Sequence, residues 1–310
     1  MKFAGPKQGT MNTNIGIDFE EKTVRSADGT SIWYVVCGEG PHTLVLAPGL
    51  ATPFISYKRI LQRFAPHLRI IAWDMRGAYR SAVPEAGVAA CRIEDHVADL
   101  EAIVEAEHLD HFILGGWSAA VQISLEYTHQ HPEKVDGLLL INGPYGHILE
   151  HAFPLPGGLS EPVMHAAVVA LQKMGPMLNP LVHCILGSGA TIKALHLASI
   201  VTANLPFFRE VVDDFRTLEF GRYFGMMQRV AEHSAEAYLD EVDVPTLITA
   251  GTKDRMTPPE SSEFMARRIK NSELVIISDG SHYTPIEFPD LLNRSLRTFF
   301  ERVYPEVSFG

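Results

Sequence analysis

Short apolar runs alternate with helical segments over the first 145 residues of the chain and again after residue 240. The runs Leu44–Leu46, Leu68–Trp73 and Val135–Ile141 are apolar at most consecutive positions, and a turn residue follows each of them. Such runs are typical of parallel strands that helices cover on both faces. Between two of the runs, Glu94–Glu107 has apolar residues at helical spacing. The alternation predicts an open α/β fold, in which ligands bind at the carboxyl ends of the strands.

Residues 145–240 interrupt this pattern. The stretch contains several prolines, has helical segments rich in Met, Leu, Phe and Val, and shows no strand signal. After it, the sequence predicts strands at Pro245–Ala250 and Glu273–Ile277, and helices at Pro259–Ile269 and Pro289–Val303. We therefore expect a mostly parallel sheet with helices on both faces, formed by residues 19–144 and 241–303, and an inserted helical cap formed by residues 145–240.

The composition narrows the range of partners. The 310 residues carry a net charge of −11 and no basic cluster, which argues against a nucleic-acid surface. Three scattered cysteines fit a reducing compartment rather than a disulfide framework. The amino-terminal residues lack a signal-peptide core, and no stretch is long and apolar enough to span a membrane. We expect a cytoplasmic protein without a membrane span, with Met1 or Met11 as its native start.

The strongest chemical signal is the segment Phe112–Ala120, which runs from a strand into a helix through small residues around Ser118. A serine at such a sharp turn projects its hydroxyl above the sheet, and Gly116 and Ala120 leave room for the turn. The start of the following helix adds N–H groups and a favourable dipole for a developing oxyanion. The pattern departs from G-x-S-x-G only at Ala120. It predicts that Ser118 is a nucleophile rather than a simple helix cap.

A base and an orienting acid are found in two later loops. His282 follows the last apolar strand, and Asp254 follows the strand that ends at Ala250, so both are expected at the same sheet edge as Ser118. Asp243 precedes its strand and belongs to the opposite edge, and Asn142 offers no carboxylate after the earlier strand. The chain order of serine, aspartate and histidine is the one found in α/β-hydrolases. The sequence predicts Ser118, His282 and Asp254 as a catalytic triad.

With these motifs the chain resembles the α/β-hydrolase superfamily over nearly its whole length, in the branch with a serine nucleophile and a helical cap. The segment Ala47–Leu50 is similar to the family's oxyanion loop, and the resemblance implies that the N–H groups of Leu50 and Ala119 bind the oxyanion. The segment Asp74–Ser81 is similar to the D-x-R-G-x-G-x-S loop, but Tyr79 replaces the second glycine. Tyr79 is therefore placed either near the substrate or at the surface.

The resemblance implies a serine hydrolase that cleaves a small to medium apolar carboxylic ester or lactone. Carbon–carbon hydrolases of the same fold remain an alternative, although Tyr283 stands where they commonly have tryptophan. A non-catalytic small-molecule receptor on the same fold is a second alternative. Six aromatic residues are the candidates for substrate contact: Tyr79, Trp117, Phe207, Phe208, Phe224 and Tyr283.

One competing motif concerns a metal. His147, Glu150 and His151 fit the H-x-x-E-H pattern of a zinc peptidase. Phe153 and Pro154 follow at once, so little helix remains to present two histidines, and a third ligand is not evident. The sequence therefore predicts no metal, no cofactor and a small ester-like molecule as the partner.

Overall fold

The computed structural model describes residues 15–151 and 160–309, without the side chains of residues 151 and 160. Met1, Met11, Phe153, Pro154 and the side chain of His151 lie outside this description. A membrane-spanning helix is not found within the described ranges.

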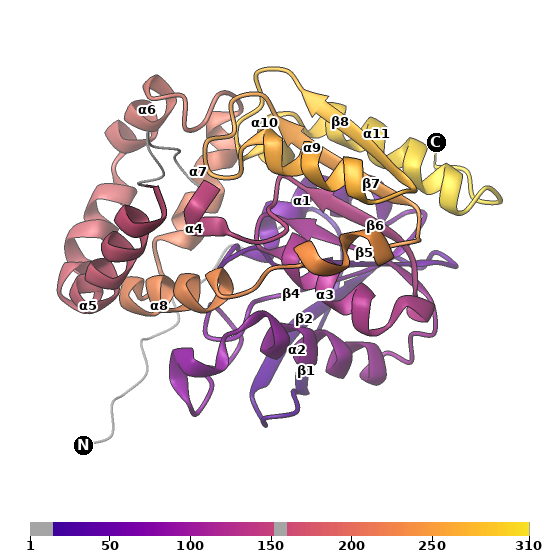
Figure 1. Ribbon diagram of the computed structural model, residues 1–310, viewed down its shortest axis with the longest axis horizontal. Coiled ribbons are helices and arrows are strands. Elements are labelled where there is room, and N and C mark those ends of the chain that lie inside the picture. The colour runs from indigo at the N-terminus through magenta and orange to yellow at the C-terminus, as the bar shows by residue number, and fades with distance from the viewer. Residues whose placement is uncertain (1–14, 152–159, 310) are drawn as a thin grey trace.

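One eight-stranded sheet organises the chain (Figure 1). The strands lie in the order β1-β2-β4-β3-β5-β6-β7-β8. The pairings β1–β2 and β2–β4 are antiparallel, and all later neighbours are parallel. The bounds are β1 Glu20–Arg25, β2 Ser31–Cys37, β3 Thr43–Ala47, β4 Arg69–Trp73, β5 Phe112–Trp117, β6 Val135–Ile141, β7 Thr246–Gly251 and β8 Ser272–Ile277. The carboxyl ends of β3 to β8 therefore meet at one edge of the sheet.

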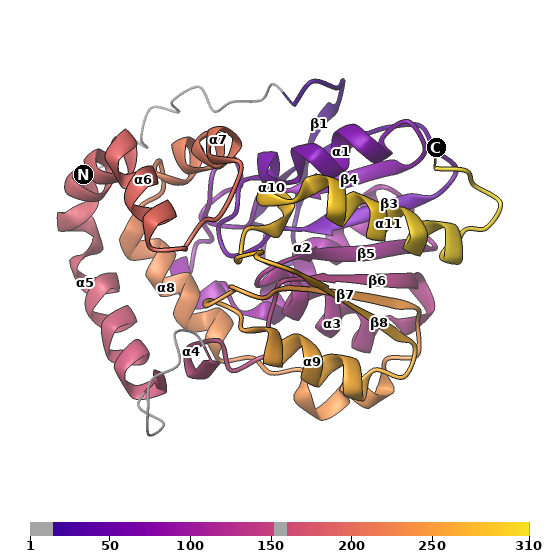
Figure 2. The same cartoon turned by 90° about the horizontal axis from the view of Figure 1, so that it is seen from above.

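Helices cover both faces of this sheet (Figure 2). Val45 and Leu114 contribute to the core under α2, α3 and α9, whereas Leu44 and Ile113 contribute to the core under α1 and α11. The opposite facing of Leu44 and Val45 explains why the strand sequences are apolar at consecutive positions. The bounds are α1 Lys58–Phe64, α2 Ile93–Ala106, α3 Ala120–Gln130, α9 Pro259–Arg268, α10 Thr284–Glu287 and α11 Pro289–Val303.

Most of the remaining helices lie between β6 and β7 and extend beyond the carboxyl edge of the sheet (Figure 1). They are α4 Ile148–His151, α5 Ser160–Gly187, α6 Gly189–Leu197, α7 Leu205–Phe215 and α8 Phe220–Ala231. Short 3-10 segments complete the described chain: η1 Phe54–Tyr57, η2 Gly87–Ala90, η3 Pro132–Lys134 and η5 Glu236–Glu241. Within residues 145–240 the described part contains no strand, and only an isolated bridge joins Gly146 to Ser234.

Candidate active site

Ser118 stands in the turn between β5 and α3. Its backbone has a φ of +65°, its N–H donates to the carbonyl of Ile141 at 3.0 Å, and its carbonyl accepts from the N–H of Val121 at 3.0 Å. A Cβ on Gly116 would lie 2.3 Å from the Cβ of Ala120 and 2.7 Å from the carbonyl oxygen of Ala47. A larger residue at Gly116 would therefore force the turn apart, which explains the small residues around Ser118.

His282 lies between Ser118 and Asp254. Its Nε2 is 3.0 Å from the Oγ of Ser118, and its Nδ1 is 3.0 Å from the Oδ2 of Asp254. His282 and Asp254 are buried, and Ser118 is partly exposed. The structure thus brings together all three residues of the predicted triad, from loops that lie far apart in the sequence.

The carboxyl group of Asp254 is held by its own loop. Its Oδ1 accepts hydrogen bonds from the N–H groups of Met256 at 2.9 Å and Thr257 at 2.8 Å. Burial by itself would raise the pKa of Asp254, but the charge of His282 and the hydrogen bonds from His282 and Thr257 outweigh it. The pKa of Asp254 lies below its usual value, so the group stays ionised in the buried site.

Thr257 and Asn142 also belong to the site, although neither was predicted to take part in it. The Thr257 hydroxyl lies 2.8 Å from Asp254 Oδ2, 3.0 Å from His282 Nδ1 and 2.9 Å from the Asn142 carbonyl oxygen. Because a hydroxyl has one proton, it donates to one oxygen while its lone pairs remain open to the Nδ1–H of His282. The Asn142 amide donates to Asp254 Oδ2 and to the carbonyl of Ser281, each at 3.2 Å. The available signal was that Asn142 directly follows β6 and that Thr257 lies in the loop after β7.

Two of the aromatic candidates, Trp117 and Tyr283, contact the ring of His282, and a third, Phe208, contacts Tyr283. The indole N–H of Trp117 donates to the His282 carbonyl at 2.7 Å, and Trp117 is buried. The Tyr283 ring meets the Trp117 ring edge to face at 5.6 Å, and the Phe208 ring of α7 meets Tyr283 edge to face at 4.8 Å. Trp117 therefore holds the histidine loop through a hydrogen bond, and Phe208 of α7 contacts the same loop at Tyr283.

Phe207 and Phe224 occupy other places. The Phe207 ring lies under the cations of Lys58 at 5.8 Å and Arg59 at 5.4 Å, so it packs against α1 rather than beside Tyr283. Phe224 contacts the ring of Tyr223 at 5.2 Å within α8. The two neighbouring residues Phe207 and Phe208 thus have different environments.

Leu50 and Ala119, the two predicted oxyanion donors, are buried and belong to the loops that follow β3 and β5. A Cβ on Gly49 would lie 2.7 Å from the Trp117 carbonyl oxygen, so the loop after β3 packs directly on the end of β5. Among residues 15–151 and 160–309, no hydrogen-bond acceptor is found for the N–H of Leu50 or of Ala119. Because buried N–H groups are seldom left unpaired, two such donors beside Ser118 are suited to an anionic oxygen.

Tyr79 supports the Leu50 loop. It takes the φ of +52° that favours glycine, and its hydroxyl reaches the carbonyl of Ala51. Burial, with the carboxylates of Asp74 and Asp214, raises the pKa of Tyr79 well above its usual value, so the hydroxyl remains a donor. The surrounding loop is anchored where Arg76 binds Asp99 through two hydrogen bonds. Tyr79 is therefore neither a surface residue nor free to move.

Positive φ values gather around these loops. The residues other than glycine with positive φ in the described chain include one after each of β3, β4, β5, β6 and β8: Ala51, Tyr79, Ser118, Asn142 and Asp279. A side chain at positive φ costs free energy, so the strain is concentrated at the edge of the sheet that carries the site.

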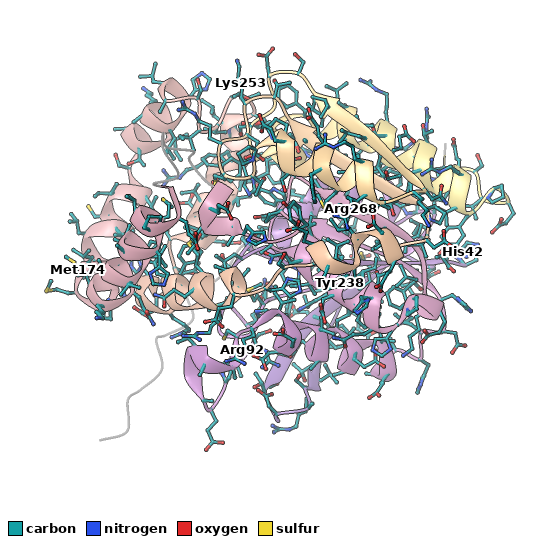
Figure 3. The ribbon with its side chains drawn as sticks, in the orientation of Figure 1. His42, Arg92, Met174, Tyr238, Lys253 and Arg268 are labelled. Atoms are coloured by element: carbon teal, nitrogen blue, oxygen red, sulfur yellow. The ribbon has the colours of Figure 1, made fainter. Side chains whose placement is uncertain are left out.

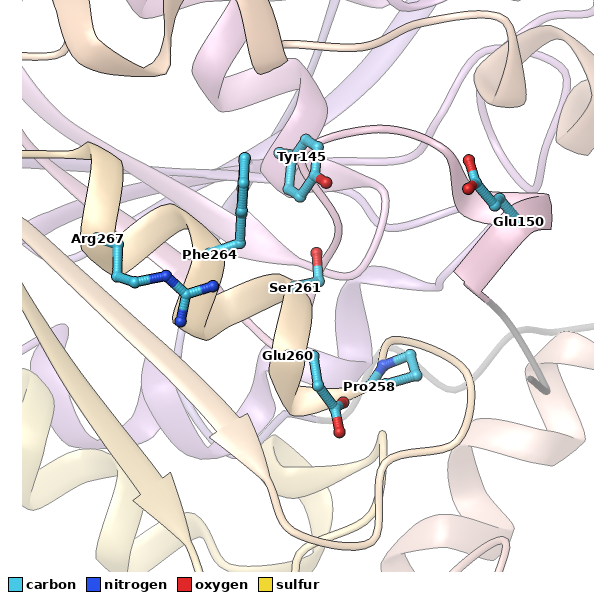
Figure 4. A pocket seen from close by; sticks show the side chains of 7 residues that line it. All are labelled: Tyr145, Glu150, Pro258, Glu260, Ser261, Phe264 and Arg267. Carbon is cyan, nitrogen blue, oxygen red and sulfur yellow. The ribbon is translucent and has the colours of Figure 1, made fainter. Parts of the chain in front are cut away.

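The described atoms of the H-x-x-E-H motif, His147 to His151, do not form a metal site. His147 Nδ1 lies 3.5 Å from Glu150, and its Nε2 lies 3.3 Å from Glu236. Glu150 faces a pocket of about 380 Å³ that Tyr145, Ser261 and Phe264 also line (Figure 4). Within residues 15–151 and 160–309, no cluster of three His, Cys, Asp or Glu residues could hold a metal ion.

The chain is similar in sequence and in structure to known hydrolases. The sequence profile of the family described as "Serine aminopeptidase, S33" matches residues 39–288. The serine hydrolase BPHL of Mus musculus is 21% identical over 280 residues, which cover 89% of this chain and 85% of that protein. A pimeloyl-[acyl-carrier protein] methyl ester esterase of Neisseria meningitidis is 26% identical over 201 residues, which cover 62% of this chain and 58% of the esterase. Among solved structures, an esterase from Exiguobacterium antarcticum superposes with a TM-score of 0.73 at 19% identity, covering 92% of this chain and 99% of the other.

Proposed function

The chain belongs to the serine aminopeptidase S33 family of α/β-hydrolases, and we propose that it is a serine hydrolase that cleaves apolar carboxylic esters or lactones. The family match confirms the predicted superfamily and the prediction that the protein is a hydrolytic enzyme. The likeness to solved α/β-hydrolase structures confirms the predicted fold class.

The observation that carries the proposal is the position of His282, 3.0 Å from both Ser118 and Asp254. With its Nδ1–H donated to ionised Asp254, the imidazole presents a free Nε2 lone pair to the Ser118 hydroxyl. This tautomer makes His282 a base toward Ser118. It also lets Asp254 stabilise the imidazolium that forms when the proton is transferred.

The reaction follows from this arrangement in two halves. The Ser118 oxygen attacks the substrate carbonyl while its proton passes to His282 Nε2, and the carbonyl oxygen becomes an oxyanion that the N–H groups of Leu50 and Ala119 bind. The imidazolium then gives its proton to the leaving alcohol, which leaves an acyl group on Ser118. Water, deprotonated by His282, attacks this ester and releases the acid, and Ser118 regains its proton.

Support for an apolar substrate comes from the side chains near His282. The Tyr283 ring lies 5.6 Å from the imidazole and the Phe208 ring packs on Tyr283, and neither side chain carries a charge at neutral pH. Burial raises the pKa of Tyr283, which keeps its hydroxyl neutral. Aromatic surface at such a place favours an apolar acyl or alcohol group.

The test is turnover of p-nitrophenyl esters of graded acyl length by the wild-type chain and its variants. We expect Ser118→Ala and His282→Ala each to lower kcat by about 10⁴ to 10⁶, because nucleophile and base act as one unit. Ser124→Ala is the matched control, since Ser124 is a buried serine of α3 without a place in the site, and it should retain nearly full activity.

Near-native activity in Ser118→Ala would refute the proposal. If the wild-type chain binds the esters but completes at most one slow turnover, the receptor alternative holds instead.

A further inference from the structure

The outer face of α5 is apolar along its length. Within the described chain, large apolar side chains that are at least 36% exposed are concentrated here: Val163, Leu171, Met174, Met177, Leu181 and Ile185. Met177 and Leu181 are exposed by 74% and 57%. At 100° per residue these side chains fall within an arc of about 120°. Figure 3 shows Met174 at the margin of the molecule, pointing away from it.

The opposite face of α5 is already occupied. It packs against α8, where a Cβ on Gly175 would lie 2.2 Å from the backbone nitrogen of Gly221. Asn179 donates to Glu219 at 3.0 Å and accepts from the N–H of Phe220 at 2.9 Å. These contacts fix which side of α5 faces outward. A helix that is apolar on two sides is usually covered on both, and the described chain covers only one.

The spacing of the outer face indicates what covers it. Apolar residues follow one another at intervals of four and three along the helix: Val163, Ala167, Ala170, Met174, Met177, Leu181 and Cys184. This alternation over about three heptads is typical of a helix that packs lengthwise against another helix. A flat lipid surface requires an apolar face but not this regular alternation of intervals of four and three.

The charge of the region favours a second copy of the chain. The whole chain carries −11, yet residues 162–209 contain no Asp or Glu, and Lys173 and Lys193 lie among them. Two copies that meet through this region bring together their least acidic surfaces, so their mutual repulsion is smallest there. Self-association through one shared patch is also the commonest form of protein dimer.

We propose that the chain forms a dimer in which two α5 helices pack antiparallel through these outer faces. The direction follows from side-chain size. The amino-terminal half of the face carries Ala167 and Ala170 between Val163 and Leu171, whereas the carboxyl-terminal half carries the large side chains Met177, Leu181 and Ile185. An antiparallel pair sets the large side chains of one copy opposite the small ones of the other, whereas a parallel pair sets large against large.

The first experiment is sedimentation velocity of the full chain from low to high micromolar concentration. We expect a species of twice the chain mass, and we expect Met177→Glu/Leu181→Glu to halve that mass while retaining esterase activity and the circular dichroism spectrum. Ile276→Glu/Leu291→Glu is the matched control: both residues are similarly apolar and exposed, but they lie on β8 and α11, and this variant should remain dimeric.

A wild-type chain that stays monomeric throughout overturns the proposal, as does a dimer that survives Met177→Glu/Leu181→Glu. Monomers that float with phosphatidylcholine vesicles, and lose this binding in the same variant, overturn it in favour of a lipid surface.

The second experiment tests the direction. In Val163→Cys the new thiol should form a disulfide with Cys184 of the second copy under mild oxidation, because the two positions lie opposite one another in an antiparallel pair. Cys184→Ala added to this variant should abolish the product. A disulfide between the two copies of Cys184 in the wild-type chain would overturn the antiparallel arrangement.

Discussion

The hydroxyl of Tyr79 donates a hydrogen bond of 2.6 Å to the carbonyl of Ala51, the residue that follows Leu50. Ala51 has a φ of +45°, and its own N–H is 3.5 Å from the sulfur of Met75. Both polar groups of this strained residue are therefore held by the loop after β4. We therefore expect the direction of the neighbouring Leu50 N–H to depend on that loop.

Tyr79→Phe tests this dependence. Loss of the hydrogen bond should cost about 1 kcal/mol, which corresponds to about a fivefold fall in kcat for p-nitrophenyl acetate with KM nearly unchanged. Tyr127→Phe is the control, because its hydroxyl bonds Glu101 at 2.6 Å away from the site. It should lower the free energy of unfolding without changing kcat. An unchanged kcat in Tyr79→Phe would show that the Leu50 loop holds its shape alone.

Thr257→Val should lower kcat about tenfold. The hydroxyl lies within 3.0 Å of both Asp254 and His282, so its removal loosens the orientation of the imidazole, at a cost of about 1.4 kcal/mol in the barrier. Steady-state kinetics provide the measurement. Thr128→Val removes a buried hydroxyl that bonds only the Ser124 carbonyl, and kcat should not change there. Equal effects in the two variants would contradict the role of Thr257.

Phe208→Ala should shift acyl-chain preference, whereas Phe207→Ala should not. Phe208 contacts Tyr283 beside His282, and removing its ring frees space for a longer acyl group. Each additional buried CH₂ contributes about 0.8 kcal/mol, or about fourfold in kcat/KM. We therefore expect the hexanoate-to-acetate ratio of kcat/KM to rise about fourfold in Phe208→Ala alone. The same rise in Phe207→Ala, whose ring packs on α1, would mean that α7 affects chain-length preference only through its general stability.

Glu126 should make the fold sensitive to acid. The His233 hydrogen bond is the largest influence on the pKa of Glu126; burial opposes it, and the Tyr238 and Gln130 hydrogen bonds add to it, lowering the pKa to about 2. A carboxyl group with a depressed pKa stabilises the fold above its unfolded value near 4.5, and this contribution is lost as the pH falls toward 2. Because the carboxyl group is only partly buried, solvent screening reduces this contribution to on the order of 1 kcal/mol.

Denaturant unfolding of wild type and Glu126→Gln at several pH values measures this. The difference in free energy of unfolding between wild type and Glu126→Gln should be constant above about pH 5.5 and should shrink below pH 4.5. A difference that does not depend on pH would assign the effect of Glu126 to packing.

Activity should survive EDTA, because no metal takes part in the proposed reaction. Loss of activity on chelation and its return with zinc would instead favour His147, Glu150 and His151.

The elements were predictable where local sequence decides them. Val135–Ile141 and Pro289–Val303 have the predicted bounds, since one is an uninterrupted apolar run and the other begins with proline at its first turn. The sequence of residues 54–64 suits a single helix, but the structure has a 3-10 segment, Phe54–Tyr57, before α1. Apolar periodicity does not separate these two helix types.

The partners within the site were less predictable. The chain order suggested Ser118, Asp254 and His282, because each follows a strand. The hydrogen bonds of Thr257 and Asn142 depend on loops that meet only in three dimensions. Phe207 and Phe208 are adjacent and chemically identical, so only the 100° turn between them on α7 decides which one reaches Tyr283.

The positive φ of Ser118 has a consequence for the evolution of the protein. Glycine adopts this backbone conformation without strain, so Ser118→Gly should be an inactive protein that is more stable than the wild type, by on the order of 1 kcal/mol. Selection for expression or heat tolerance alone would therefore favour mutants that have lost the nucleophile. Only selection for turnover keeps a serine there, and directed evolution of this chain needs an activity screen in every round.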